Sequence, residues 1–86
     1  MTTATRARQL RQDAVKTLGH VIEDMTRYSR ICHRVAGEWS IIAASPDHSE
    51  AHRNDAAQQS ARERAEGSRV ALWVRDIQAA VDDLER

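Results

Sequence analysis

An unbroken apolar stripe with helical spacing constrains this chain more than any other feature. Its members recur at alternating steps of four and three residues: Ala14, Leu18, Val21, Met25, Tyr28, Cys32, Val35, Trp39 and Ile42. Steps of that size keep side chains on one face of an α-helix, and they are typical of helices that pack against other helices. The spacing therefore predicts one long helix over about residues 5–44.

The stripe on this first helix is wider than a single neighbouring helix covers. Four residues extend it on one side: Val15, Ile22, Ala36 and Ala43. An apolar surface of that width is normally buried against more than one neighbour. We therefore expect the chain to form a helical bundle by self-association, as a homodimer or a higher homo-oligomer.

The sequence Ser45-Pro46-Asp47 is the clearest helix boundary in the chain. The residue before a proline is disfavoured from helical geometry, whereas proline itself suits the first position of a helix. With Ser45 as its N-cap, a second helix is predicted over about residues 46–85. Two long helices joined by so short a link fold back on each other. The whole chain, residues 1–86, is thus predicted to be a single all-α domain, an antiparallel helical hairpin.

A fold at Ser45 and Pro46 also predicts which residues face each other. It places Val21 beside Val70 and Arg8 beside Asp83. The part of the chain before the fold has seven basic and four acidic residues, and the part after it has six basic and nine acidic residues. The two helices are therefore expected to attract each other, although each exposed ion pair contributes only about 0–1 kcal/mol.

The second helix is uneven in its apolar content. From Pro46 through Ser68 the only hydrophobic residues are alanines, and larger ones resume at helical spacing only afterwards: Val70, Val74, Ile77, Val81 and Leu84. The pair Gly67-Ser68 separates the two parts and predicts a kink near Gly67. The alanine-rich part offers little to cover the large residues at the end of the first helix.

Composition excludes several classes of protein. No apolar run approaches the roughly 18 residues that a membrane span needs, so no membrane association is expected. The single cysteine, Cys32, excludes an internal disulfide and fits a reducing compartment, so the predicted location is cytoplasmic. Twelve arginines against one lysine suggest a GC-rich bacterial or phage genome. No catalytic or cofactor-binding motif is present, so we expect neither enzymatic activity nor a cofactor.

Large apolar residues without an expected cover are the first candidate site. They are Trp39, Ile41 and Ile42 near the predicted hairpin tip, together with Leu72 and Trp73 on the second helix. Tryptophan is the residue most often found at the energetic centre of protein interfaces. These five residues are the predicted partner-binding residues.

A basic face on the first helix is the second candidate. Arg27, Arg30 and Arg34 share one side of the helix, which is a pattern that can bind the phosphates of a nucleic acid or nucleotide. The chain has no net charge, and this favours a solvated, salt-bridged face over nucleic-acid binding.

A weak metal-binding pattern lies just after the proline. His48 and His52 are one helical turn apart, and Asp55 follows at a further turn, so the three can face one metal ion if all are helical. A pair of histidines is little evidence for a metal, and packing over the hairpin tip is the preferred interpretation.

Two residues of the stripe have predicted structural roles. Cys32 is expected to be buried between the helices, since its place in the stripe directs it away from the neighbouring His33. Tyr28 is expected to reach its hydroxyl to the rim of the interface, where an arginine or Glu63 can bind it.

The sequence therefore predicts a small non-enzymatic interaction protein that self-associates and binds a larger macromolecule, as an inhibitor or an adaptor. Two alternatives remain. One is a nucleic-acid or nucleotide binder that uses the three arginines, and the other is a metal-responsive helical protein.

Overall fold

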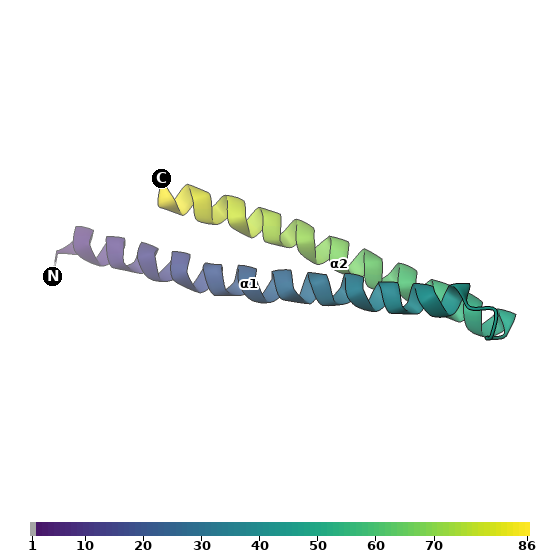
Figure 1. Cartoon of the computed structure of the whole chain (residues 1–86). Helices are drawn as coiled ribbons and strands as arrows, with labels where there is room; N and C mark the ends of the chain where they lie inside the picture. Colours follow the sequence, from purple (N-terminus) through teal and green to yellow (C-terminus); the bar gives the residue numbers. More distant parts are fainter. Residues whose placement is uncertain (1) are drawn as a thin grey trace.

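A computed structural model describes residues 2–86, which form two antiparallel helices (Figure 1). Helix α1 spans Thr3–Ala44 and helix α2 spans Glu50–Glu85, with no strand in the described range. The molecule is a rod with extents of 69 × 15 × 13 Å. The prediction of an all-α helical hairpin is confirmed. Neither helix, within residues 2–86, contains a stretch long and apolar enough to cross a membrane.

Local capping explains where α1 begins and ends. The hydroxyl of Thr2 accepts a hydrogen bond from the backbone N–H of Thr5 at 3.1 Å, so the helix begins two residues before the predicted start. At the other end Ser45 has extended backbone angles, φ −79° and ψ 122°, as expected for a residue that precedes proline. The predicted end at Ala44 is confirmed.

The second helix begins four residues later than predicted, because Ser49 and not Ser45 is its N-cap. The Ser49 hydroxyl accepts from the backbone N–H of His52 at 3.2 Å. Pro46 lies in a turn closed by a 3.4 Å hydrogen bond from the N–H of His48 to the carbonyl of Ser45. Residues 45–49 therefore form a real connection between the helices.

This longer connection shifts the alignment of the two helices. The Ser29 hydroxyl donates to the Gly67 carbonyl and the Ser60 hydroxyl to the Ala36 carbonyl, both at 2.8 Å. Each residue of α1 therefore faces an α2 residue that is five positions later in the sequence than the one the predicted fold placed opposite it. At the open end Leu84 lies beside Gln12 and Val15, and the first turns of α1 extend past the end of α2 (Figure 1).

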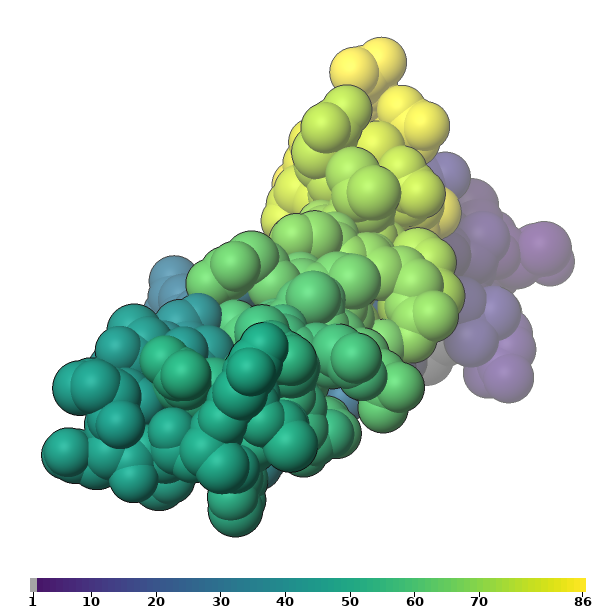
Figure 2. Space-filling model, turned by 90° about the vertical axis from the view of Figure 1, so that its right-hand side faces the viewer, coloured from purple at the N-terminus to yellow at the C-terminus, as the bar shows by residue number. Residues whose placement is uncertain are grey.

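Small side chains dominate the contact between the helices near the tip. The buried residues are Ser29, Cys32 and Ala36 on α1 and Ala56, Ser60, Gly67, Val70 and Val81 on α2. The spacing between packed helices depends on the side chains at their contact, so small residues allow a close approach. Figures 1 and 2 both show the helices close together at the tip and further apart toward the termini.

Gly67 lies at this close contact, inside one continuous helix. A Cβ atom built on Gly67 would lie 3.1 Å from the Cβ of Cys32 and 3.0 Å from Nε2 of His33. The pair Gly67-Ser68, for which the sequence predicted a kink, does not end the helix, because α2 runs without a break from Glu50 to Glu85. The glycine serves to bring the two backbones together.

Candidate interaction surface

The face that α1 turns toward α2 differs from the centre of the predicted stripe. It is the Ala36 side of the stripe, and it includes Ser29 and Ser40, whose hydroxyl lies 2.7 Å from that of Ser60. The larger stripe residues Tyr28 and Val35 are thereby displaced to the edge of the contact, where Tyr28 is 47% exposed. In this part of the hairpin small residues of α1 form the contact, and Tyr28 and Val35 border it.

A network of polar and aromatic side chains links the two helices along this edge. The Tyr28 hydroxyl donates to a Glu66 carboxylate oxygen at 3.4 Å, and Glu66 forms an ion pair with Arg69. The guanidinium of Arg69 lies 5.5 Å from the centre of the Trp73 ring, within the range of a cation–π interaction. Tyr28 and Trp73 therefore lie on the same side of the hairpin.

The exposed apolar residues of that side form a surface that we name the apolar flank. It consists of Leu10, Val21, Tyr28, Ile31, Val35 and Ile42 of α1 and Trp73 of α2. Four of the α1 residues follow one another at seven-residue intervals from 21 to 42, which keeps them on one stripe of the helix. Val35 and Ile42 are half-buried, and the other members are at least 37% exposed.

The predicted partner of Tyr28 was wrong by about one helical turn. The sequence indicated an arginine or Glu63, and the structure has Glu66, because the connection between the helices is longer than predicted. The pKa of the Tyr28 phenol is raised above its ordinary value of 10.0, first by interaction with the Cys32 side chain and then by the negative charge of Glu66. The phenol therefore remains a neutral hydrogen-bond donor to the carboxylate.

The structure places the five predicted partner-binding residues on different surfaces. Trp39 and Ile42 are half-buried near the tip, whereas Ile41 is 72% exposed on the outer side of α1. Trp73 lies in the flank at the level of Val21 to Tyr28, and the neighbouring Leu72, which is 57% exposed, lies outside it. Ile42 and Trp73 thus belong to the apolar flank at different levels of the rod, whereas Ile41 and Leu72 lie outside it.

The three arginines of the basic face are all exposed on the outer side of α1. Arg27 lies 3.6 Å from Asp24, and a shallow hollow beside Arg27 and Arg30 is also lined by Glu23. Acidic groups therefore alternate with the basic ones on this face. Nucleic-acid binding by Arg27, Arg30 and Arg34 stays a prediction, and retention on a nucleic-acid column that falls steeply with salt would support it.

The metal-binding pattern depended on a helix that begins before His48, and α2 begins only at Glu50. The rings of His48 and His52 lie 5.6 Å apart and are tilted by 58°. Among residues 2–86, no three side chains of His, Cys, Asp or Glu come together as a metal site, and Asp55 is exposed on α2. The geometry that the metal hypothesis assumed is not formed.

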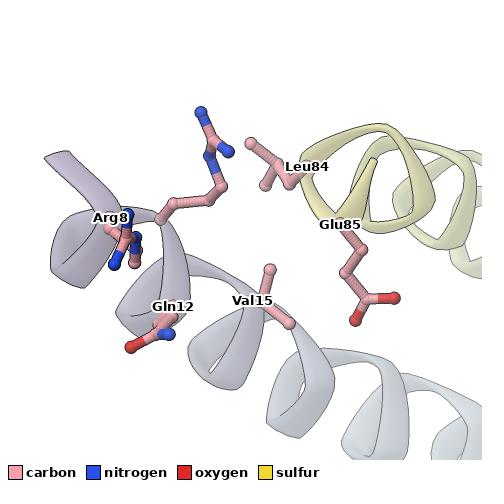
Figure 3. Close-up of a pocket in the computed structure, with 6 residues that line it drawn as sticks. Arg8, Gln12, Val15, Leu84 and Glu85 are labelled. Atoms are coloured by element: carbon pink, nitrogen blue, oxygen red, sulfur yellow. The ribbon is translucent and has the colours of Figure 1, made fainter. Parts of the chain in front are cut away.

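A hollow of about 300 Å³ occupies the open end of the hairpin (Figure 3). Its lining residues are Arg8, Arg11, Gln12, Val15, Leu84 and Glu85. The sequence predicted ion pairs between the arginines and the acidic residues near the C-terminus. Instead, Asp83 pairs with Arg86 at 3.7 Å, and all three ion pairs among residues 2–86 join residues three apart in one helix.

The prediction for Cys32 is confirmed, since its side chain is 3% exposed in the contact between the helices. Sequence reasoning did not identify Ile31 as a surface residue, nor the bridge through Glu66 and Arg69. A usable signal was present, because Glu66, Arg69 and Trp73 follow one another at steps of three and four residues on one side of α2.

No known family model, curated protein or solved structure matches this chain. The candidate function therefore depends on the surface itself. An exposed aromatic and aliphatic flank with a polar bridge across it is suited to packing against other helices.

Proposed function

We propose that this protein is a small non-enzymatic helical interaction protein, of bacterial or phage origin. It self-associates and binds a larger macromolecular partner as an inhibitor or an adaptor. Its working parts are two: the apolar flank, which packs against other helices, and the outer surface around Ile41 near the tip, which contacts the larger partner.

The exposure of Tyr28 and Trp73 in one flank carries this proposal. The two side chains are 47% and 50% exposed. Burying the exposed halves of these rings removes about 200 Å² from water, which contributes about 5 kcal/mol before the costs of association. Tyrosine, tryptophan and arginine are also the residues that most often dominate binding energy, and Arg69 lies against Trp73 in this flank.

Ile41 supports a second contact surface because it is the most exposed large hydrophobic residue among residues 2–86, at 72%. It lies on the outer side of α1, away from both α2 and the flank. Trp39 and Ile42 lie in the same helical turn as Ile41 and are half-buried, so their side chains are partly held within the hairpin. A partner that covers Ile41 can therefore bind without opening the hairpin.

The substitution Ile41→Asp tests the role of the tip. Because Ile41 is largely exposed, the change leaves helicity and oligomer mass unaltered, while a charge in a desolvated contact weakens partner binding by about 2–5 kcal/mol. The measurement is quantitative mass spectrometry of proteins captured by the immobilised chain from an extract of its source organism.

Gln58→Asp is the matched control, since Gln58 is an exposed polar residue of α2 and acquires the same charge. It retains the captured protein, whereas Ile41→Asp loses it. Equal capture by both variants removes the tip from the proposed function. Loss of the oligomer with Ile41→Asp reassigns the tip to self-association.

A further inference from the structure

We propose that a second copy of this chain covers the apolar flank in an antiparallel, two-fold arrangement. In it, the N-terminal segment of each copy, residues 3–13, lies beside the hairpin tip of the other, residues 38–55. This inference rests on the proposed function, and it names the first occupant of the flank and its orientation.

The surface area of the chain is the first argument. The hairpin exposes 6560 Å², whereas a globular monomer of 9.7 kDa exposes about 5,100 Å². The excess of about 1,400 Å² exceeds the roughly 800 Å² that each partner contributes to a standard interface. The radius of gyration, 19.9 Å against about 12 Å for a compact domain of this length, reflects the same extended shape. A second hairpin against the flank removes part of this excess surface from water.

The arrangement of the flank along α1 gives the position of the two-fold axis. Leu10 and Ile42 mark the two ends of the exposed stripe, and residue 26 is its midpoint. In an isologous contact residue i of one copy meets residue j of the other, and residue j meets residue i in turn. An axis at residue 26 places Leu10 opposite Ile42 of the partner subunit, and Val21 opposite Ile31 of the partner subunit.

The same axis brings the tryptophans together. The hydrogen bond from Ser29 to Gly67 aligns the helices so that residue 26 of α1 lies level with about residue 70 of α2. Trp73 is therefore within one turn of the axis, and the rings of the two copies become neighbours at the centre of the interface. Fully desolvated aromatic residues at the centre are typical of stable interfaces.

Charge complementarity selects the antiparallel orientation. The N-terminal segment carries three arginines and one aspartate: Arg6, Arg8, Arg11 and Asp13. The tip carries four acidic residues and one arginine: Glu38, Asp47, Glu50, Asp55 and Arg53. The ion pairs found within residues 2–86 use none of these groups. An antiparallel dimer sets the basic segment of each copy beside the acidic tip of the other, whereas a parallel dimer brings the two basic segments to the same end of the assembly.

Cross-linking between two different cysteine variants tests the orientation. Both chains carry Cys32→Ala, which removes the native thiol; one also carries Leu10→Cys and the other Ile42→Cys. After mixing and mild oxidation, the expected product is a disulfide-linked pair that contains one chain of each kind. Neither variant cross-links with itself at a comparable rate, because each new thiol faces the other end of the partner.

Leu72→Cys replaces Ile42→Cys in the control mixture. Leu72 is also exposed but lies outside the flank, so no rapid cross-link with the Leu10→Cys chain is expected. Rapid self-linking of the Leu10→Cys chain overturns the antiparallel arrangement, as does cross-linking to Leu72→Cys at the rate seen with Ile42→Cys.

The mass of the unmodified chain is the independent measurement. Light scattering after size exclusion gives twice 9.7 kDa, and Ile31→Asp in the flank lowers it to 9.7 kDa, whereas Ile41→Asp does not. A monomeric mass at micromolar concentration overturns the second copy as the occupant. If the monomer still captures a partner through Ile41, the partner-binding part of the proposed function stands without self-association and without this inference; if capture also fails, both parts are overturned.

Discussion

Replacing Gly67 with alanine has two opposing effects on the stability of the hairpin, and the size of each can be estimated. Alanine in place of glycine inside a helix normally stabilises it by about 1 kcal/mol. At Gly67 the new Cβ would lie 3.0 Å from Nε2 of His33 and 3.1 Å from the Cβ of Cys32. The exposed imidazole can rotate away, but the Cβ of Cys32 is fixed to the backbone of α1. The helices must therefore separate by a few tenths of an ångström.

Separation of the helices also strains a buried hydrogen bond. The Ser29 hydroxyl donates to the Gly67 carbonyl at 2.8 Å, and this bond lengthens as the backbones move apart. Overpacking of a close contact costs about 1–3 kcal/mol, and a weakened buried hydrogen bond adds about 1 kcal/mol. After the gain in helix propensity, we expect Gly67→Ala to lower the free energy of unfolding by about 1–3 kcal/mol.

The chain provides matched controls for this substitution. A Cβ on Gly19 or Gly37 would meet nothing within 4 Å, so alanine at either position stabilises the protein by about 1 kcal/mol. Urea denaturation followed by circular dichroism, at one fixed protein concentration, compares the three variants. If Gly67→Ala is as stable as Gly37→Ala, the close contact between the helices does not constrain residue 67, and the reasoning is refuted.

Two further predictions concern the centre of the contact and its edge. Cys32 is 3% exposed, so we expect it to react slowly with thiol reagents in the folded protein; labelling as fast as in denaturant contradicts its burial. Cys32→Ser lowers the free energy of unfolding by about 1–3 kcal/mol, because it buries an unpaired hydroxyl. Tyr28 is the only tyrosine, so an ultraviolet titration, with helicity monitored, reports its pKa. We expect this pKa to lie above 10.0 in the wild type and to be lower in the Glu66→Gln variant, which lacks the negative charge. A wild-type midpoint that is not raised contradicts the predicted shift.

The hairpin and the end of α1 could be predicted from the sequence, because both depend on local chemistry. A stripe at helical spacing and the position before Pro46 are strong signals that do not depend on distant residues. The start of α2 was harder, since Ser45 and Ser49 are both good N-caps. Choosing the first shortened the connection, and every predicted contact across the hairpin inherited an error of about one turn.

The candidate site was only partly predictable, because α1 carries two adjoining apolar stripes. One has small side chains, such as Ser29 and Ala36, and the other has large ones, such as Tyr28 and Val35. The serines were counted as polar and left out of the pattern. In the structure they lie inside, since each hydroxyl bonds to a backbone carbonyl or to another hydroxyl across the contact. The helical spacing of the apolar residues alone could not decide which stripe faces α2.

Side-chain size decides which of the two stripes of α1 faces α2. The buried residues in the first half of α2 are alanine, serine and glycine, and a close approach of the backbones is possible only if α1 also presents small residues there. Tyr28 and Val35 are then displaced to the edge of the contact. We therefore expect folding and the proposed association to depend on different faces of one helix: substitutions on the Ala36 side should alter the stability of the hairpin, and substitutions on the Tyr28 side should alter the proposed binding.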